Sequence, residues 1–286
     1  MKNTGIIKNS KSLISLAEEN KLPVHQYMDM ETLNWIISLN PFKNKSSLAS
    51  LFPVESVDLL YKFLPQKKWF LVKDEISTIH GIRHLLRVVV YMIILSPTKE
   101  LSTQKIINRI IAAGLHDIRR LNDKSDPDHG KRSAEWFLEN YKKISEQFGC
   151  NLTEYDKDDI YYSIYFHDVE YGVFEKTPEY YKHKPSIDIL KTSDALDRYR
   201  LPKKKWWFDK KLVKFPVTEN IMKFAYEFII NTEMYYLKNL CDTSSVINLL
   251  SLDLPRNNHL HNFKKLNFVK FNLFQALNSK VQRKHS

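Results

Sequence analysis

The chain has 286 residues, 43% of them hydrophobic, so it can bury a sizeable core and does not have the composition of a disordered segment. Six glycines without a glycine-rich phosphate loop disfavour a turn-rich β architecture, and two cysteines are too few for a disulfide framework. The formal net charge is +11, and from Lys203 onward fifteen Lys or Arg stand against six Asp or Glu. This excess fits either an ordinary lysine-rich surface or a face that binds a polyanion.

No stretch of the chain resembles a membrane span. The longest apolar run, Val88 to Leu95, has eight residues, whereas about 20 are needed to cross a bilayer. The first twenty residues lack the apolar core of a signal peptide. We therefore expect a cytoplasmic protein that does not associate with membranes.

Apolar residues recur at helical spacing along most of the chain. In chain order, the predicted helices cover residues 10–20, 30–39, 56–64, 76–95, 101–117, 129–148, 156–174, 185–200 and 217–240. Ser102 or Thr103 is a candidate N-cap for the helix over 101–117. The pattern predicts an all-α fold with an N-terminal helical segment (1–75), a core (76–202) and a basic C-terminal helical extension (203–286) that packs on the core.

Titratable residues mark five successive segments of the predicted core. They are His84, His116, Asp117, His129, His167 and Asp194. Each alone has an ordinary structural explanation, such as a buried core histidine, a capping turn or an ion pair between Asp194 and Arg198. Together they supply nitrogen and oxygen ligands that suit Mn, Fe, Co, Ni or Zn. Burying so many polar groups without a metal would carry a large desolvation cost.

In this order the residues resemble the HD-domain superfamily of metal-dependent phosphohydrolases. The local strings agree: HxxRV at His84, an apolar helix that ends in LHD at His116, DPxHG at His129 and DALDR at Asp194. The resemblance covers about residues 76–215. It implies an HD-domain helical bundle, here with additional N- and C-terminal helices.

The resemblance also implies a metal site with two divalent ions. The positions that hold the first ion are matched by His84, His116, Asp117 and Asp194. The second ion would be held by His129 and His167, with Asp117 bridging both. His80 lies four residues before His84 and is expected on the same helix face, so it competes as a ligand. The HxxRV context favours His84 as the metal ligand. His80, Arg87 and Asp197 are then expected to lie next to the ligands without binding the metal themselves.

The expected reaction is hydrolysis of a phosphoester by a metal-activated water. Three cations near the ligands are expected to neutralise the phosphate: Arg120, Lys131 and Arg198. Each of them can instead form an ion pair with a neighbouring Asp. The expected ligand is a phosphorylated small molecule, a nucleotide or a nucleic acid. Mono- or diester preference, metal identity and the number of ions stay open.

Two other functions remain possible from the sequence. The same ligand set fits an HD-fold di-iron oxygenase, and the basic C-terminal third fits a nucleic-acid-binding module with a structural or degenerate metal site. The segment KKKWWFDKKLVKF likewise has two interpretations. Trp206, Trp207 and Phe208 can stack on bases, or they can anchor the C-terminal helices hydrophobically, which we favour.

Overall fold

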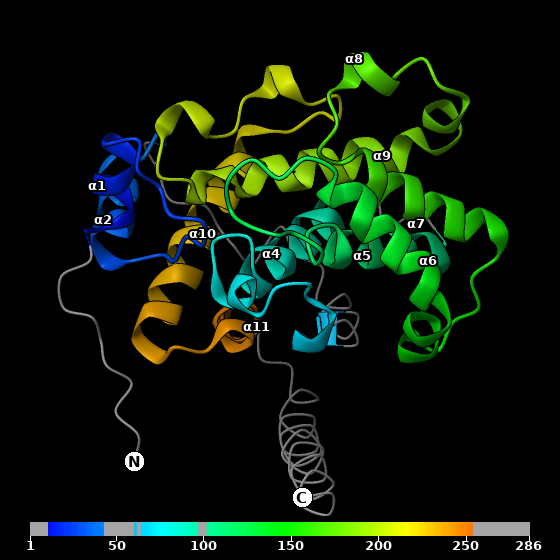
Figure 1. Cartoon of the computed structure of the whole chain (residues 1–286), viewed down its shortest axis with the longest axis horizontal. Helices are drawn as coiled ribbons and strands as arrows, with labels where there is room; N and C mark the ends of the chain where they lie inside the picture. The colour runs from blue at the N-terminus through cyan, green and yellow to red at the C-terminus, as the bar shows by residue number, and fades with distance from the viewer. Residues whose placement is uncertain (1–10, 43–59, 62–63, 97–101, 254–286) are drawn as a thin grey trace, which may run out of the picture. The chain divides into compact units, whose positions relative to one another are not determined.

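The computed structural model describes residues 11–42, 60–61, 64–96 and 102–253. These residues are mostly helical and include no strand, which confirms the all-α prediction (Figure 1). The α-helices are α1 (Leu13–Glu18), α2 (Met30–Ser38), α4 (Ile82–Leu95), α5 (Thr103–Leu115), α6 (His129–Phe148), α7 (Glu154–Phe166), α8 (Tyr171–Phe174), α9 (Pro178–Leu196), α10 (Glu219–Asn239) and α11 (Asp242–Asp253). Short 3-10 helices lie between them: η3 (Lys67–Trp69), η4 (Lys73–Ser77), η5 (Asp197–Arg200), η6 (Lys204–Trp206) and η7 (Lys210–Leu212).

Helix α4 lies at the centre of the fold because it is apolar on nearly all sides. Every residue from Ile82 to Ile93 is buried. Helix α4 packs against α5 and α9, and α7 packs against α5, α6 and α9. Figure 1 shows α4 and α5 in the middle, with α9 crossing above them and α6 and α7 beside them. No described helix is both long enough and apolar enough to span a membrane.

Several predicted helix boundaries shift. Ser102 is the N-cap of α5, since its side chain accepts a hydrogen bond from the backbone N–H of Lys105. The helix expected over 156–174 is interrupted between Phe166 and Tyr171. Helix α9 begins at Pro178, not at Pro185, which lies inside it. Of the helix expected over 56–64, Leu60 and Tyr61 are helical, and most of the rest lies outside the described residues, as do residues 254–286.

The prediction that His80 and His84 share one helix face is wrong, because α4 begins only at Ile82. The chain over 73–77 is the 3-10 helix η4, and a tight turn follows it. Gly81 is required in this turn: a Cβ there would lie 2.2 Å from the carbonyl oxygen of Ile76. His80 therefore stands in the turn before the helix.

A second apolar cluster joins the N-terminal helices to α10. Trp207 is buried in it and lies edge-on to Trp35 and Tyr199, with ring centroids 5.8 and 5.6 Å apart. The indole N–H of Trp207 donates to the carbonyl oxygen of Leu201 at 2.9 Å. The anchoring interpretation thus describes Trp207, whereas its neighbour Trp206 is only half-buried.

Replacing Trp207 with alanine should lower the free energy of unfolding by about 3–5 kcal/mol, because it leaves a cavity between α2, η5 and α10. The matched control is Trp206→Ala, for which we expect a loss of about 1 kcal/mol or less. Urea denaturation followed by circular dichroism measures both. Equal losses for the two variants would contradict the anchoring role of Trp207.

Candidate metal centre

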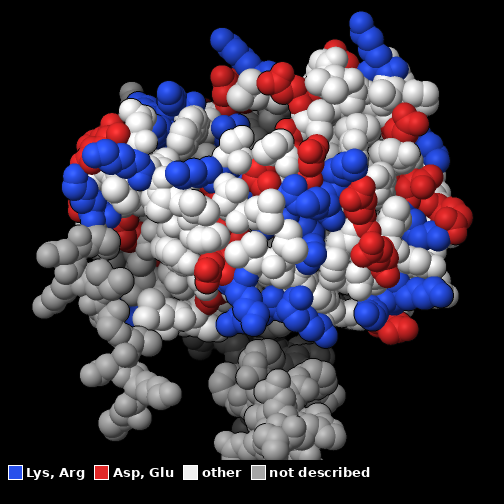
Figure 2. Space-filling view, in the orientation of Figure 1, with Lys and Arg blue, Asp and Glu red and all other residues white. Residues whose placement is uncertain are grey.

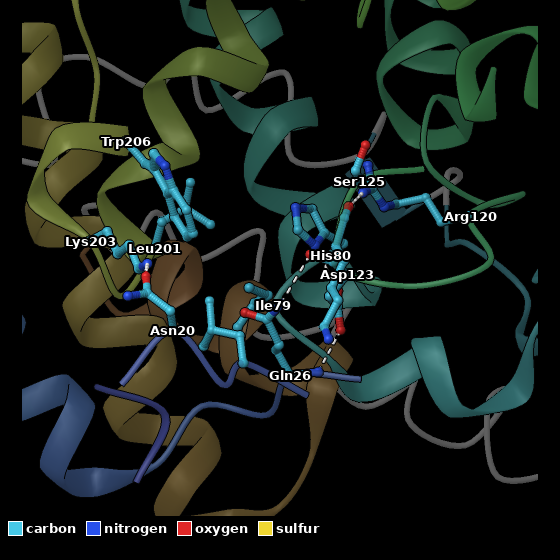
Figure 3. Close-up of a pocket in the computed structure, with 12 residues that line it drawn as sticks. Asn20, Gln26, Ile79, His80, Arg120, Asp123, Ser125, Leu201, Lys203 and Trp206 are labelled. Carbon is cyan, nitrogen blue, oxygen red and sulfur yellow. Dashed lines mark hydrogen bonds and ion pairs between the residues drawn. The ribbon is translucent and has the colours of Figure 1, made fainter. Parts of the chain in front are cut away.

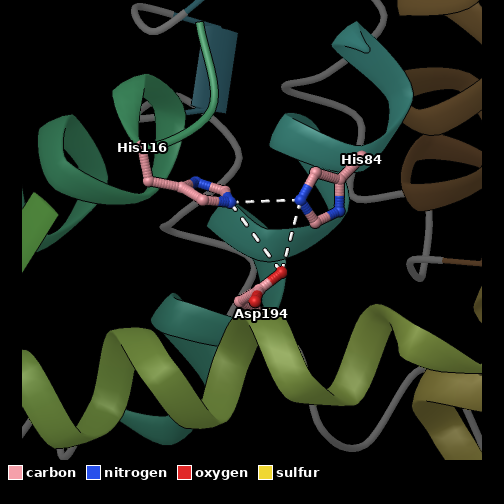
Figure 4. A group of neighbouring side chains, drawn as sticks. All are labelled: His84, His116 and Asp194. Carbon is pink, nitrogen blue, oxygen red and sulfur yellow. Dashed lines mark hydrogen bonds and ion pairs between the residues drawn. The ribbon is translucent and has the colours of Figure 1, made fainter. Parts of the chain in front are cut away.

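Three side chains from three helices converge in the centre of the fold (Figure 4). His84 Nε2 lies 3.1 Å from His116 Nε2 and 3.4 Å from Asp194 Oδ1. His116 Nε2 lies 3.9 Å from the same Asp194 oxygen. His84 comes from the first turn of α4, His116 caps the C-terminus of α5, and Asp194 lies near the end of α9.

A second pair of histidines faces the same centre. His129 Nε2 lies 3.0 Å from His167 Nε2. His129 is the first residue of α6, and His167 caps the C-terminus of α7. The two helix ends approach closely because Gly130 has no side chain. A Cβ at Gly130 would lie 3.0 Å from His167 Nδ1 and 2.6 Å from Asp168 Oδ1.

Asp117 stands between the two pairs. Its Oδ2 lies 3.5 Å from His84 Nε2 and 4.0 Å from His116 Nε2. Its Oδ1 lies 3.0 Å from His129 Nε2 and 3.3 Å from His167 Nε2. One carboxylate therefore presents a different oxygen to each pair, which is the arrangement that a bridging ligand requires.

The outer nitrogens of all four rings have oxygen partners that can only accept a hydrogen bond. The Nδ1 atoms of His116, His129 and His167 each lie 2.7 Å from the backbone carbonyl oxygen three residues earlier. His84 Nδ1 lies 2.8 Å from Asp197 Oδ2. Each Nδ1 therefore carries the proton, and in a neutral ring the lone pair is on Nε2. All four lone pairs point into the centre.

The side chains that converge here could hold a cation. A proton can join two facing imidazole nitrogens, whereas a divalent ion would also neutralise the adjacent carboxylate oxygens of Asp117 and Asp194. Metal–nitrogen bonds of about 2.1 Å place two ligands of one ion about 3.0–3.4 Å apart, depending on geometry. The separations within each pair, 3.1 and 3.0 Å, fall in that range. His84, His116 and Asp194 form one group able to hold an ion, and His167 and Asp117 contribute to another.

The electrostatics act differently on the side chains of the centre. Burial alone would lower the pKa of His167, but the hydrogen bond to Asp117 and the nearby carboxylates raise it, which favours a second proton on this ring when no metal is bound. Burial lowers the pKa of His116 to about 3, so this ring is neutral at physiological pH. Burial alone would raise the pKa of both carboxyls, but Arg120 and, in acidic solution, the protonated histidines outweigh it. Arg120 and the histidines hold the pKa of Asp117 well below its usual value, and His84 and His116 lower that of Asp194 to about 2.

Behind His84 lies a buried network of ion pairs. Arg87 donates from Nε and Nη2 to the two oxygens of Asp197, at 2.6 and 2.9 Å, and from Nη1 to Glu233 at 2.6 Å. Arg83 donates to Glu233 as well, at 3.0 and 3.1 Å. The two arginines and two carboxylates fix the orientation of the His84 ring, as outer hydrogen-bond partners of metal ligands do.

The three predicted phosphate-binding cations lie in different places relative to the centre. Arg120 reaches the centre, with Nη1 3.7 Å from Asp117 Oδ1 and 3.1 Å from His129 Nε2. Lys131 does not: it is two residues past His129, about 200° around α6, and its half-exposed side chain pairs with Glu135 at 4.0 Å. Arg198 makes no contact with the cluster among the interactions of the described residues, and Arg200 instead is buried beside Asp197, 3.4 Å away.

A partly buried lysine that the sequence did not single out supports the second histidine pair. Lys191 Nζ donates to the carbonyl oxygens of Phe166, His167 and Val169, at 3.0, 2.9 and 2.6 Å. Burial lowers the pKa of Lys191 to about 8. The ammonium group thus ties the end of α7, which carries His167, to α9, which carries Asp194. In the sequence Lys191 looks like any helix lysine, so no local signal could have found it.

A cavity of about 430 Å³ adjoins the cluster (Figure 3). Arg120 and His80 line one side of it, and Lys203 and Trp206 line the other. His80 Nδ1 lies 2.6 Å from Asp123 Oδ1, and burial holds the pKa of His80 well below its usual value. His80 therefore faces the cavity as a neutral imidazole instead of joining the ligands.

A third cluster of titratable groups lies around the buried carboxylate of Asp123. His25 Nδ1 lies 2.5 Å from Glu75 Oε1, and Thr78 Oγ1 lies 3.2 Å from Glu75 Oε2 and 3.1 Å from Asp123 Oδ1, so it can donate to either. Burial raises the pKa of Glu75 to about 7, so this carboxyl retains a proton in weakly acidic solution. Since these groups satisfy one another with hydrogen bonds, we assign them a structural role.

The face shown in Figure 2 carries both signs of charge. Lys and Arg lie among Asp and Glu over the described part of the chain, and a compact group of basic side chains lies near the middle of this face. Much of the basic C-terminal segment predicted to bind a polyanion, residues 254–286, lies outside the described residues.

Comparison with known proteins identifies no relative of this chain. No protein-family model, curated protein or solved structure matches it. The function therefore has to be inferred from the side chains and their geometry.

Replacing Asp197 with asparagine should lower the free energy of unfolding by about 3 kcal/mol or more, because it removes the carboxylate from buried Arg87 and Arg200. Lys131→Ala is the control and should change it by less than about 0.5 kcal/mol. Urea denaturation measures both. If Asp197→Asn unfolds at the wild-type midpoint, the network does not stabilise the fold as described.

Proposed function

We propose that this chain is a metal-dependent phosphohydrolase of the HD-domain type. The observation that carries the proposal is the position of Asp117, whose two oxygens face two different histidine pairs. The order of the ligands along the chain, and their distribution over α4, α5, α6, α7 and α9, agree with the resemblance seen in the sequence.

We propose that the centre holds two divalent transition-metal ions. His84, His116 and Asp194 would hold one, His129 and His167 the other, and Asp117 both. Such ions, when bound, supply a water of lowered pKa and polarise a phosphoryl oxygen. Arg120 can donate to His129 Nε2 at 3.1 Å. The Nε2 atoms of His84 and His116 face each other, and with both Nδ1 atoms protonated these lone pairs favour a metal site over a purely structural cluster.

The chain's own residues would bind and orient the phosphoester. Arg120 touches Asp117 and lines the cavity, so its guanidinium group can neutralise phosphate charge next to the ligands. His80 lines the same cavity, and Asp123 fixes its Nδ1 proton, which leaves Nε2 as a hydrogen-bond acceptor for the substrate. The half-exposed Lys131 is no longer part of the proposed machinery.

The cavity favours a small phosphorylated substrate. Its volume of about 430 Å³ is at the small end of the range of small-molecule sites, about 300–1,000 Å³. Three basic side chains line it, Arg120, Lys124 and Lys203, against one carboxylate, Asp123, which is already hydrogen-bonded to His80. This excess of positive charge suits an anionic ligand such as a nucleotide.

Elemental analysis of the purified wild-type protein should find about two transition-metal ions per chain. His129→Ala and His167→Ala should each retain about one ion, because the first ligand set stays intact. Asp117→Ala should lose affinity for both. In a panel of phosphomonoesters and phosphodiesters with Mn²⁺ or Co²⁺, each variant should lose activity by at least about 100-fold. Lys131→Ala is the control and should retain both ions and activity.

The alternatives predict other outcomes. Oxygen consumption that requires reduced iron, with no hydrolysis under anaerobic conditions, would instead favour an oxygenase. Bound metal with no turnover of any phosphoester or oxygen would favour a structural metal site in a binding module. A metal-free wild-type protein that hydrolyses no phosphoester after addition of Mn²⁺, Co²⁺, Ni²⁺ or Mg²⁺ would refute the proposal.

A further inference from the structure

The two adjacent tryptophans of the segment KKKWWFDKK face different surroundings. Trp207 is buried in the apolar cluster between α2 and α10. Trp206, one residue earlier at the end of η6, is half-buried and lines the cavity beside the metal centre. Packing in the apolar cluster explains why a tryptophan stands at position 207. Trp206 is not part of that cluster, so packing there does not explain it.

The wall around Trp206 is held in place by specific contacts. Lys203 Nζ donates to Asn20 Oδ1 at 2.7 Å and lies 5.0 Å from the centroid of the Trp206 ring. Next to Trp206 the cavity is lined by Leu22 and Leu201, which pack against the same apolar cluster as Trp207. The wall therefore offers an aromatic ring, two aliphatic side chains and one ammonium group hydrogen-bonded to Asn20.

The opposite wall is polar and adjoins the candidate ligands. Figure 3 shows Trp206 and Lys203 across the cavity from His80 and Arg120. Arg120 joins this wall to the metal centre, because the same guanidinium group lies 3.7 Å from Asp117. A ligand that fills the cavity would thus meet a cationic end beside the candidate metal ligands and an aromatic end at Trp206, 12 residues beyond Asp194 in the chain.

We infer that Trp206 is a specificity-determining residue that stacks on a flat, uncharged ring of the substrate while the phosphate lies toward Arg120. This inference rests on the proposed phosphohydrolase function and narrows it to a monomeric phosphoester with an aromatic heterocycle, such as a nucleoside monophosphate. Stacking of a base on an aromatic side chain is favourable and tolerates every base, because each base has a π face. The cavity volume suits one nucleotide, not a longer strand.

The test compares kcat/KM for the four ribonucleoside 5′-monophosphates with kcat/KM for ribose 5-phosphate, which lacks the base. In the wild type we expect the nucleotides to be preferred by about tenfold or more. Trp206→Ala should lower that ratio about tenfold, and Trp206→Phe should retain most of it. Trp136→Ala is the matched control, because Trp136 is a half-buried tryptophan that pairs with Trp69 and does not line the cavity. An unchanged ratio in Trp206→Ala would overturn the inference.

Binding of free nucleosides separates this inference from the proposed function. Calorimetry with adenosine, guanosine, cytidine and uridine needs no hydrolysis and can use the full-length wild type and its Trp206→Ala variant. Binding that weakens about tenfold in Trp206→Ala supports the stacking wall even if no phosphoester is cleaved. Hydrolysis of phosphoesters without any nucleoside binding would overturn the inference and leave the phosphohydrolase proposal intact.

Discussion

The carboxylate of Asp117 is the point on which the candidate centre depends. It is buried, and it lies within hydrogen-bond or ion-pair distance of imidazoles from α4, α5, α6 and α7. A buried carboxylate is costly unless positive groups surround it. Neutral imidazoles that direct Nε2 lone pairs at Asp117 do not offset its charge, and Arg120 supplies a fixed cation beside it.

A hydrogen bond from Nδ1 to a nearby backbone carbonyl oxygen orients three of the four histidines. Helix ends leave backbone carbonyl or N–H groups without partners inside the helix. His116 and His167 stand at the C-termini of α5 and α7, and each donates its Nδ1 proton to the carbonyl three residues earlier. His129, the first residue of α6, donates in the same way to Asp126 in the loop before the helix. Capping and ligand orientation are thus one interaction, and only His84 relies on a distant residue, Asp197.

The buried ion pairs behind His84 connect the centre to the C-terminal helices. Asp197 and Glu233 hold Arg87, and Glu233 also holds Arg83. These contacts bring η5 and α10 against α4, so the chain from Leu201 to Leu252 belongs to the same compact unit as the candidate ligands. The cavity that we assign to the substrate exists because of this packing, since Lys203 and Trp206 close it from one side.

Much of the site could be predicted from the sequence, because its signals are local. Apolar periodicity predicted the helices, and the order of His84, His116-Asp117, His129, His167 and Asp194 predicted a set of side chains that the fold brings together. The sequence did not predict the turn at Gly81. A glycine is required there because the carbonyl oxygen of Ile76 lies too close for a Cβ, and the sequence pattern does not reveal that contact. Lys131 was misjudged for a related reason: two residues along a helix turn a side chain to the opposite face.

The sequence by itself determined which elements are helical and which residue types can bind metal, because both follow from spacing over a few residues. The position of each side chain depends on the tertiary structure. In the fold, the two oxygens of Asp117 face different histidine pairs and Arg120 points inward. Trp206 lines the cavity, whereas Trp207 lies in the core. Such outcomes depend on the relative rotation of packed helices, and that rotation is set by contacts between residues far apart in the chain.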